Sequence, residues 1–167
     1  MIPPVSRFPS LLLLFGTLAL GCASPPGGGE IHFSGTLPSG ASARVEVDAT
    51  PLAADRRAAF LAHGGAARVG TAVLQELTNV GKGDAGTVVK VRITRFRLRS
   101  GSSAFWLGAM AGADFIGCTV EVLQGSNSTH SFETDTSTIL GGLIMPGPVT
   151  RFDRLVAELA RRIAAKV

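Results

Sequence analysis

The chain has 167 residues, of which 46% are hydrophobic and 17% charged, and its formal net charge is +4. This composition excludes an intrinsically disordered chain, because disordered chains combine low hydrophobicity with high net charge. The length is sufficient for one domain. Only two cysteines are present, which excludes a disulfide-rich scaffold, so the domain must be held together by its hydrophobic core.

The N-terminal segment has the pattern of a secretory leader. Arg7 supplies a positive charge, and an apolar run over residues 11–20 leads to Cys22. The run is shorter than the roughly 20 apolar residues needed to span a bilayer. Its length and flanks are typical of the apolar region of a signal peptide. We therefore predict a signal peptide over residues 1–21, with cleavage near Ala23 as the alternative.

The end of this leader, Leu18 to Cys22, resembles the lipobox of bacterial lipoproteins, with Ala19 where leucine is commonest. The resemblance implies a diacylglyceryl group on the Cys22 sulfur and attachment to the membrane through that lipid. Each buried lipid methylene stabilises such an anchor by about 0.8 kcal/mol. The residues after the cysteine, Ala23 and Ser24, resemble those of lipoproteins sorted to the outer membrane.

Lipidation at Cys22 bears on the second cysteine, and the residues after it connect the anchor to the domain. Cys118 is left without an intramolecular disulfide partner, and its place in an apolar alternating run predicts a buried, inert thiol. Proline and glycine over residues 25–29 predict a flexible tether. The expected organisation is a lipidated cysteine and tether over residues 22–30 and a single domain over residues 31–167.

The first half of the domain predicts strands and one long helix. Alternating polarity indicates a strand over residues 43–48, with a short strand at Ile31 and Phe33 before it. Thr50-Pro51 has the pattern of a helix N-cap followed by proline at the first helical position. One helix is then expected from about Leu52 to Asn79, with Gly81 just past its end.

The second half predicts three strands and a final helix. In the first of these strands, residues 87–99, the apolar series changes phase, and a β-bulge near Thr94-Arg95 would restore one apolar face. Further strands are expected over residues 115–123 and 129–139, and an amphipathic helix begins at Pro148. The order predicts an α+β two-layer sandwich, in which two helices cover one face of a mostly antiparallel sheet of about four strands.

The motifs of common active sites are weak in this sequence. Residues 81–86 match G-x-G-x-x-G, but a dinucleotide site needs a strand before this motif and a helix after it, and the predicted order is the reverse. The histidines His32, His63 and His130 lack metal-ligand spacing, and no G-x-S-x-G motif is present. We therefore expect no enzymatic activity, no metal and no cofactor.

Five cations follow one another along the predicted strand over residues 87–99 and would share its solvent face: Lys90, Arg92, Arg95, Arg97 and Arg99. They can protect a sheet edge against aggregation, or they can contact an anionic surface such as lipid headgroups. Nucleic acid is not an expected partner, because no aromatic residues interleave on this face.

Two apolar, glycine-rich connections flank the predicted strand pair and would leave the sheet at the same end. We interpret them as a partner or oligomer contact, because loops are normally polar; the alternative is that they fold back on the core. Their large apolar side chains are those of Phe105, Trp106, Leu107, Met110, Leu143, Ile144 and Met145.

The chain also resembles an uncharacterised family of bacterial envelope lipoproteins of unknown function, whose domain is similar to the N-terminal domain of the periplasmic protein TolB. The resemblance covers most of residues 43–166 and rests on the glycine-rich segment 101–117 and on Gly141-Gly142 before the last helix. It implies an envelope lipoprotein without catalytic residues.

The leader and the apolar connections together predict a non-catalytic lipoprotein that serves as a binding or assembly module at the periplasmic membrane surface. Its expected partners are the membrane, through the lipid on Cys22, and an envelope protein or further copies of the chain. The alternatives are a structural subunit of an envelope secretion or transport complex and, more remotely, a small periplasmic enzyme.

Lipidation at Cys22 can be tested directly. Mass spectrometry of the mature chain should find Cys22 as the first residue, carrying a diacylglyceryl thioether, and Cys22→Ala should release the chain from membranes. An unmodified N-terminus would remove the lipid anchor from this account.

Overall fold

The computed structural model describes residues 33–35, 43–82, 85–101, 112–139 and 146–167. Within these residues the chain forms five strands and three helices: β1 (Phe33–Gly35), β2 (Arg44–Asp48), α1 (Ala54–Ala62), α2 (Gly65–Asn79), β3 (Thr87–Arg97), β4 (Asp114–Gln124), β5 (Asn127–Thr138) and α4 (Pro148–Lys166).

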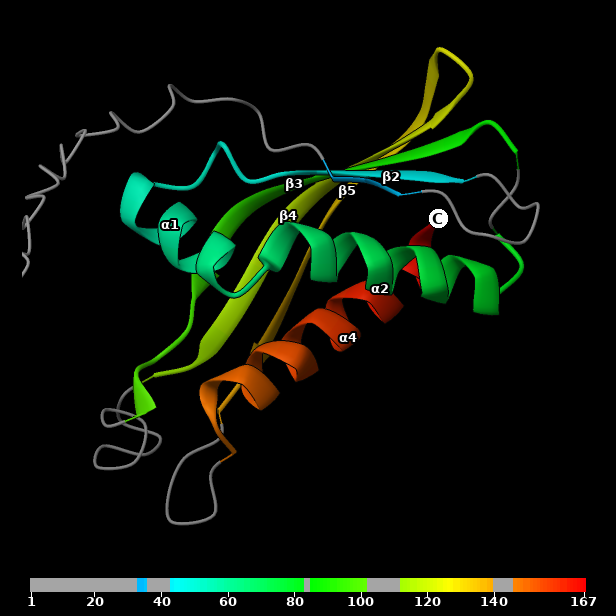
Figure 1. Cartoon of the computed structure of the whole chain (residues 1–167). Helices are drawn as coiled ribbons and strands as arrows, with labels where there is room; N and C mark the ends of the chain where they lie inside the picture. Colours follow the sequence, from blue (N-terminus) through cyan, green and yellow to red (C-terminus); the bar gives the residue numbers. More distant parts are fainter. Residues whose placement is uncertain (1–32, 36–42, 83–84, 102–111, 140–145) are drawn as a thin grey trace, which may run out of the picture.

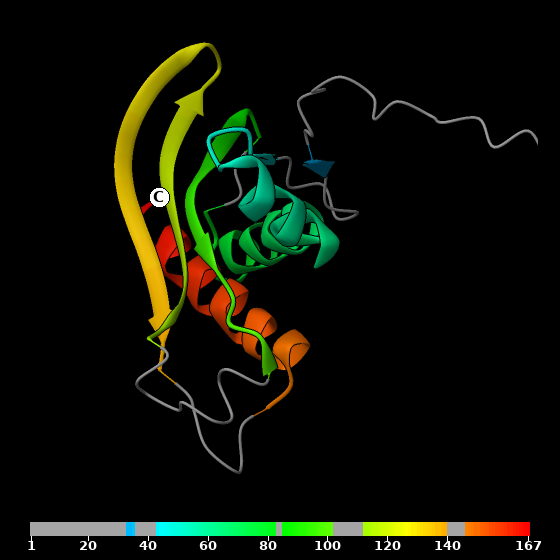
Figure 2. The same cartoon turned by 90° about the vertical axis from the view of Figure 1, so that its left-hand side faces the viewer.

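The strands form one mixed sheet in the order β1-β2-β3-β4-β5. β2 and β3 are parallel, and the other neighbours are antiparallel. The parallel pair is connected through α1 and α2, and these helices lie with α4 on one face of the sheet (Figures 1 and 2). The predicted α+β sandwich is therefore confirmed, with three helices in place of the expected two.

The extra helix arises because the expected helix from Leu52 to Asn79 is two helices. The chain turns between them at Gly64, which has a positive φ of 65°, a conformation that glycine adopts without a steric penalty. Glycines inside a helix cost only about 1 kcal/mol each, so the sequence did not show that the helix ends here. The break directs α1 across the core and brings Phe60 into it, fully buried.

The predicted N-cap is also wrong. α1 begins at Ala54, and Ala53 before it supplies no side-chain cap. The Thr50 amide and hydroxyl instead donate to Oδ1 of Asp48, at 2.8 and 2.6 Å. An aspartate two residues earlier thus forms a local turn and engages the threonine before the helix begins.

Two other predicted backbone features are confirmed. Gly81 has a φ of 69°, and its amide donates to Thr78 while that of Lys82 donates to Leu77, the hydrogen-bond pattern of a Schellman helix terminus. The register of β3 against β4 shifts between Ile93 and Arg95. This bulge lets Ile93 and Phe96 both face the core, in which they are 0% and 2% exposed.

The core lies between the sheet and the helices and contains an aromatic cluster. Phe60 of α1, Phe96 of β3 and Phe152 of α4 meet edge to face, with ring centroids 5.3 to 6.1 Å apart. Such pairs add about 0.5–1.5 kcal/mol to the burial of their surface. The cluster joins three elements that are distant in the sequence.

Part of the free edge of β5 is covered by side chains of α4. Nη1 of Arg162 donates to the backbone carbonyl of Asp135 at 2.7 Å, and Nζ of Lys166 donates to that of Glu133 at 3.1 Å. β3 lies at the centre of the sheet, so its cations do not protect an edge and that interpretation is wrong. The cations that block strand pairing belong to the last helix.

The break between α1 and α2 can be tested at Gly65. A Cβ added there would lie 2.5 Å from the ring of Phe60, which is fixed by its aromatic neighbours. Gly65→Ala should destabilise the fold by about 1–3 kcal/mol, the usual range for an overpacked core, measured by urea unfolding. Gly147→Ala is the matched control, because no atom lies within 4 Å of its added Cβ; equal stability of the two variants would contradict this account.

Candidate functional site

One end of the sheet collects the ends of four elements. β3 ends there at Arg97, which is in register with Phe115, and Asp114 at the start of β4 is in register with Thr138 at the end of β5. α4 begins at the same end (Figure 1). We call this the loop end. The expectation that both apolar connections leave the sheet at one end is confirmed by this register.

The connecting segments themselves, residues 102–111 and 140–145, lie outside the described residues. So do all the apolar side chains predicted to form the contact: Phe105, Trp106, Leu107, Met110, Leu143, Ile144 and Met145. Cys22 and the leader also lie outside the described residues.

A buried ionic cluster joins the bases of these connections. Arg99 donates to Oδ1 of Asp114 from its backbone amide at 2.7 Å and from Nε at 3.1 Å. Arg151 donates from one guanidinium nitrogen to Oδ2 of Asp114 at 2.5 Å and from the other to the backbone carbonyl of Arg99 at 2.7 Å. The cluster therefore ties the chain leaving β3 to the start of β4 and the first turn of α4.

The three side chains are removed from solvent. Asp114 and Arg151 are 0% exposed, and Arg99 is 4% exposed. Burial alone raises the pKa of the Asp114 carboxyl, but hydrogen bonds from Arg99 and Arg151 and the charge of Arg151 outweigh it, so this pKa lies below its ordinary value. The carboxylate is ionised at neutral pH and compensates buried guanidinium charge.

Within the described part of the chain, Nε of Arg151 makes no hydrogen bond although it is buried. A buried donor without a partner costs about 1–3 kcal/mol, so the cluster is not optimised for stability alone. Buried ionic groups of this kind can instead fix one arrangement among alternatives. Here the arrangement fixed is the relative position of β3, β4 and α4 at the loop end.

Sequence reasoning missed this cluster. It placed Arg99 on the solvent face with the other cations, and it did not single out Asp114 or Arg151. The predicted exposure of Arg99 is wrong, because this residue lies beyond the end of β3 and its side chain is buried. A usable signal existed for Arg151, which precedes Leu155 and Leu159 at spacings of four and so shares their buried helix face.

Large apolar side chains are exposed beside the cluster. Ile139, directly after β5, is 65% exposed, and Val149 in the first turn of α4 is 51% exposed. They flank residues 140–145 on either side. Val80, which is 50% exposed, follows α2 at the opposite end of the sheet, where β3 begins.

The outer face of the sheet, which the helices leave uncovered (Figure 2), carries the other predicted cations. Arg92, Arg95 and Arg97 are exposed and Lys90 is half-buried. Carboxylates lie beside two of them: Arg92 pairs with Asp48 of neighbouring β2 at 3.4 Å, and Arg95 pairs with Asp135 of β5 at 3.9 Å. Lys90 is in register with Glu46 and Glu121.

This arrangement reduces the positive character of the outer face. Partial burial raises the pKa of Asp48, but hydrogen bonds from Thr50 and the charge of Arg92 outweigh it and the pKa is lowered. The carboxylate is thus ionised beside Arg92. Attraction between this face and an anionic surface is correspondingly weaker than five aligned cations would give.

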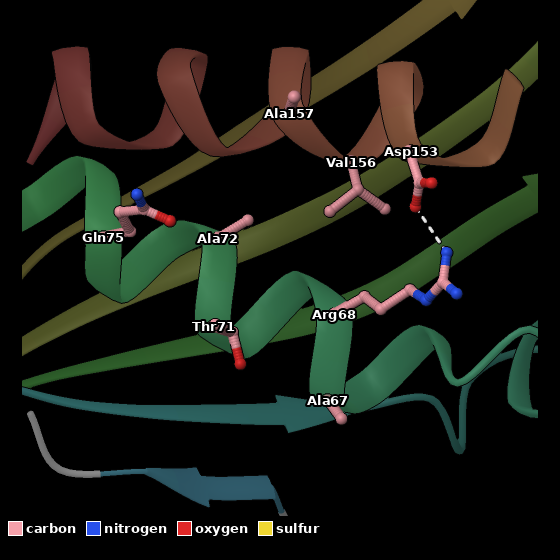
Figure 3. A pocket seen from close by; sticks show the side chains of 8 residues that line it. All are labelled: Ala67, Arg68, Thr71, Ala72, Gln75, Asp153, Val156 and Ala157. Atoms are coloured by element: carbon pink, nitrogen blue, oxygen red, sulfur yellow. Dashed lines mark hydrogen bonds and ion pairs between the residues drawn. The ribbon is translucent and has the colours of Figure 1, made fainter. Parts of the chain in front are cut away.

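A shallow groove of about 440 Å³ runs between α2 and α4 (Figure 3). Its two charged residues, Arg68 and Asp153, form an ion pair with each other. The guanidinium of Arg68 also lies 5.9 Å from the ring centroid of Phe152. The groove is lined by Ala67, Arg68, Thr71, Ala72, Gln75, Asp153, Val156 and Ala157.

Cys118, His63 and His130 each lie against other side chains of the fold. Cys118 is buried as predicted, and burial raises the pKa of its thiol to about 12, so the thiol stays protonated at neutral pH. His63 stacks on Phe152 with ring centroids 5.3 Å apart, and His130 lies 5.2 Å from Phe132. His32 lies outside the described residues.

No group of three or more histidine, cysteine, aspartate or glutamate side chains among the described residues could hold a metal ion. No helix among those residues is long and apolar enough to cross a membrane.

Among solved structures, the chain is similar to a Xanthomonas campestris protein of the DUF330 family, with a TM-score of 0.46 and 10% identity over 59% of this chain and 58% of that one. It is similar to a Caulobacter crescentus CB15 protein described as a "putative lipoprotein", with a TM-score of 0.36 and 19% identity over 59% and 80% of the two chains. It is also similar to PelC from Paraburkholderia phytofirmans, a dodecamer, with a TM-score of 0.39 and 16% identity over 57% and 74%.

The chain thus spans less than two thirds of the length of the Xanthomonas protein. No protein-family model and no curated protein matches it.

The buried cluster can be tested by removing its negative charge. Asp114→Asn should lower the free energy of unfolding by about 3–5 kcal/mol, because two arginines remain buried without their carboxylate. Asp153→Asn, which breaks an exposed ion pair, should cost about 0–1 kcal/mol. Urea unfolding at neutral pH measures both changes, and equal losses would contradict a special role of Asp114.

The pKa of Asp114 adds a pH dependence to this test. Because the pKa is lowered in the folded chain, the ionised carboxylate stabilises the fold fully above its unfolded-state value of about 3.9. That contribution is lost as the pH falls through the lower folded-state pKa. The stability difference between the natural chain and Asp114→Asn should therefore shrink in acid, and a constant difference would contradict this ionisation.

Proposed function

We propose that this chain is a lipid-anchored, non-catalytic binding or assembly module of the bacterial cell envelope, facing the periplasm and sorted to the outer membrane, and that it contacts partner proteins through the loop end. The leader ending in Cys22 supports export and anchoring. The tether after it gives the domain a short reach from the membrane surface. The loop end supports the binding role.

The observation that carries the proposal is the exposure of Ile139 and Val149 at one end of the sheet, 65% and 51%. Fully burying an aliphatic side chain of this size contributes about 1.5–3 kcal/mol. These residues adjoin the connections whose sequences are rich in large apolar residues. A contiguous exposed apolar surface is typical of a protein contact, and we propose that Ile139 and Val149 belong to one.

The buried cluster supports the same role. Arg99, Asp114 and Arg151 hold the bases of both connections by hydrogen bonds between buried groups. A contact surface on a fixed base loses less conformational entropy when a partner binds. The cluster thus supports a binding role for the loop end.

The proposal predicts where partners can be captured in cells. With a photoreactive benzoyl-phenylalanine at Ile139 or Val149, irradiation of intact cells should give a discrete crosslinked adduct. The same group at Val80, which is 50% exposed at the opposite end, should give none. Immunoblotting and mass spectrometry of the adducts provide the measurement.

A second set of variants controls for folding. Ile139→Ser combined with Val149→Ser should leave the unfolding midpoint nearly unchanged, because both side chains are exposed, and should weaken the adduct formed from a neighbouring position. Adducts that form equally from Val80, or from no position, would count against the loop end as the contact surface.

A further inference from the structure

The last helix carries a row of side chains along the free edge of the sheet. Arg154, Glu158, Arg162 and Lys166 follow one another at intervals of four, which corresponds to about 6 Å along the helix axis. Backbone groups of β5 that point away from β4 recur every second residue, at about 6.8 Å. Successive members of the row can therefore meet successive outward-pointing carbonyls.

The match holds for two members of the row and then fails. Lys166 and Arg162 donate to the carbonyls of Glu133 and Asp135. By the two-residue period, the next outward-pointing groups are those of Ser137. The residue of the row at this position is Glu158, whose carboxylate cannot donate to a carbonyl. It accepts instead from Arg161 and Arg162, at 2.8 and 2.9 Å.

A cavity of about 310 Å³ opens where the capping fails, between the end of β5 and α4. Ser137 is exposed, and within the described part of the chain its outward amide and carbonyl make no hydrogen bond. Exposed Ile139 follows two residues later. The cavity is lined by Thr136, Ser137, Thr138, Arg154, Leu155, Ala157, Glu158 and Arg161.

The cavity is positively charged. Arg154 and Arg161 line it, and Glu158, which pairs with Arg161 and Arg162, supplies the negative charge among the residues that line it. A hydrogen bond from Arg162 and the charges of both neighbouring arginines lower the pKa of Glu158, so its carboxylate is ionised. Among the described residues Arg154 makes no ion pair or hydrogen bond.

We propose that this cavity receives an extended acidic segment of the partner protein. The segment adds a short strand to β5, by hydrogen bonds with the outward amide and carbonyl of Ser137. A carboxylate of the segment binds Arg154 and shares Arg161, as charge-assisted hydrogen bonds favour. An apolar residue of the segment packs on Ile139. The inference rests on the proposed function and names the chemistry of the partner at the loop end.

The open length of the edge limits this pairing. The carbonyls of Glu133 and Asp135 are already occupied by α4, so a partner strand can pair only beyond Asp135. The contact is consequently short, and its affinity depends on the carboxylate as well as on the backbone. Binding of the segment should weaken with added salt, because the arginines are exposed.

The test uses the mature full-length chain in detergent micelles and measures fluorescence anisotropy of a short labelled peptide of alternating valine and glutamate. This peptide should bind, and a peptide of alternating valine and lysine should not. Arg154→Gln should weaken binding by about tenfold, which corresponds to the loss of one charged hydrogen bond. Arg44→Gln, at the start of β2 and at the opposite end of the sheet, is the control and should bind like the natural chain.

A backbone-methylated form of the acidic peptide separates strand addition from simple charge attraction. It keeps the carboxylates but lacks amide donors, and it should bind much more weakly. The proposal is overturned by equal binding of the methylated peptide, by equal effects of Arg154→Gln and Arg44→Gln, or by no binding of the acidic peptide. Self-association of the chain that Arg154→Gln abolishes in sedimentation velocity would also overturn it, because the occupant would then be a second copy.

The crosslinking experiment keeps this inference distinct from the proposed function. Adducts from Ile139 that persist unchanged in the Arg154→Gln chain would overturn the acidic-segment inference and leave the loop end as the contact surface. Loss of adducts from Ile139, but not of expression, in the Arg154→Gln chain would support the inference.

Discussion

The positions of β3, β4 and α4 at the loop end depend on the carboxylate of Asp114 between two buried arginines. Arg99 leaves β3, Asp114 opens β4 and Arg151 lies in the first turn of α4, so three distant parts of the chain meet at one anion. Burying charged groups is costly, and their attraction compensates only when the geometry and the hydrogen bonds are good. The cluster meets that condition for the carboxylate, which receives hydrogen bonds on both oxygens.

The exposed apolar residues at the loop end lie on a base whose geometry is fixed. Val149 lies in the first turn of α4, which the buried cluster fixes, and Ile139 follows β5, whose last residue Thr138 is in register with Asp114. The cavity between β5 and α4 opens beside Ile139, so apolar and cationic features adjoin there. We regard this end as the binding face because the outer face of the sheet pairs its cations with carboxylates, whereas Arg154 makes no ion pair among the described residues.

The arginines of this domain show how neighbours assign a role to one residue type. Arg92 pairs with Asp48 on the outer face, Arg162 covers an edge carbonyl, and Arg99 is buried. The guanidinium stays charged in all of these settings. What changes is the acceptor that the fold places within reach, and this decides whether an arginine stabilises the fold, prevents aggregation or remains available to a partner.

Local patterns in the sequence were sufficient for much of the fold. The bulge in β3, the Schellman terminus at Gly81, the burial of Cys118 and the start of α4 at Pro148 follow from backbone periodicity and from the conformational preferences of single residues. The end of α1 was missed because it depends on Gly64 and on the ring of Phe60, whose place is set by Phe96 and Phe152. The prediction of Thr50 as the N-cap was wrong because its hydroxyl donates to Asp48.

The sequence by itself determined the class of fold and the chemical character of the apolar connections, and it predicts a leader, because periodicity and composition act over short stretches of chain. Only the tertiary structure decided that Arg99 is buried, that Arg151 reaches Asp114 and that the capping of β5 stops at Ser137. Arg99 and Arg151 are 52 residues apart, and the partner of each side chain depends on which strands become neighbours. Hydrogen bonds and ion pairs act over a few ångströms, so their partners are known only once the sheet and helices have been brought together.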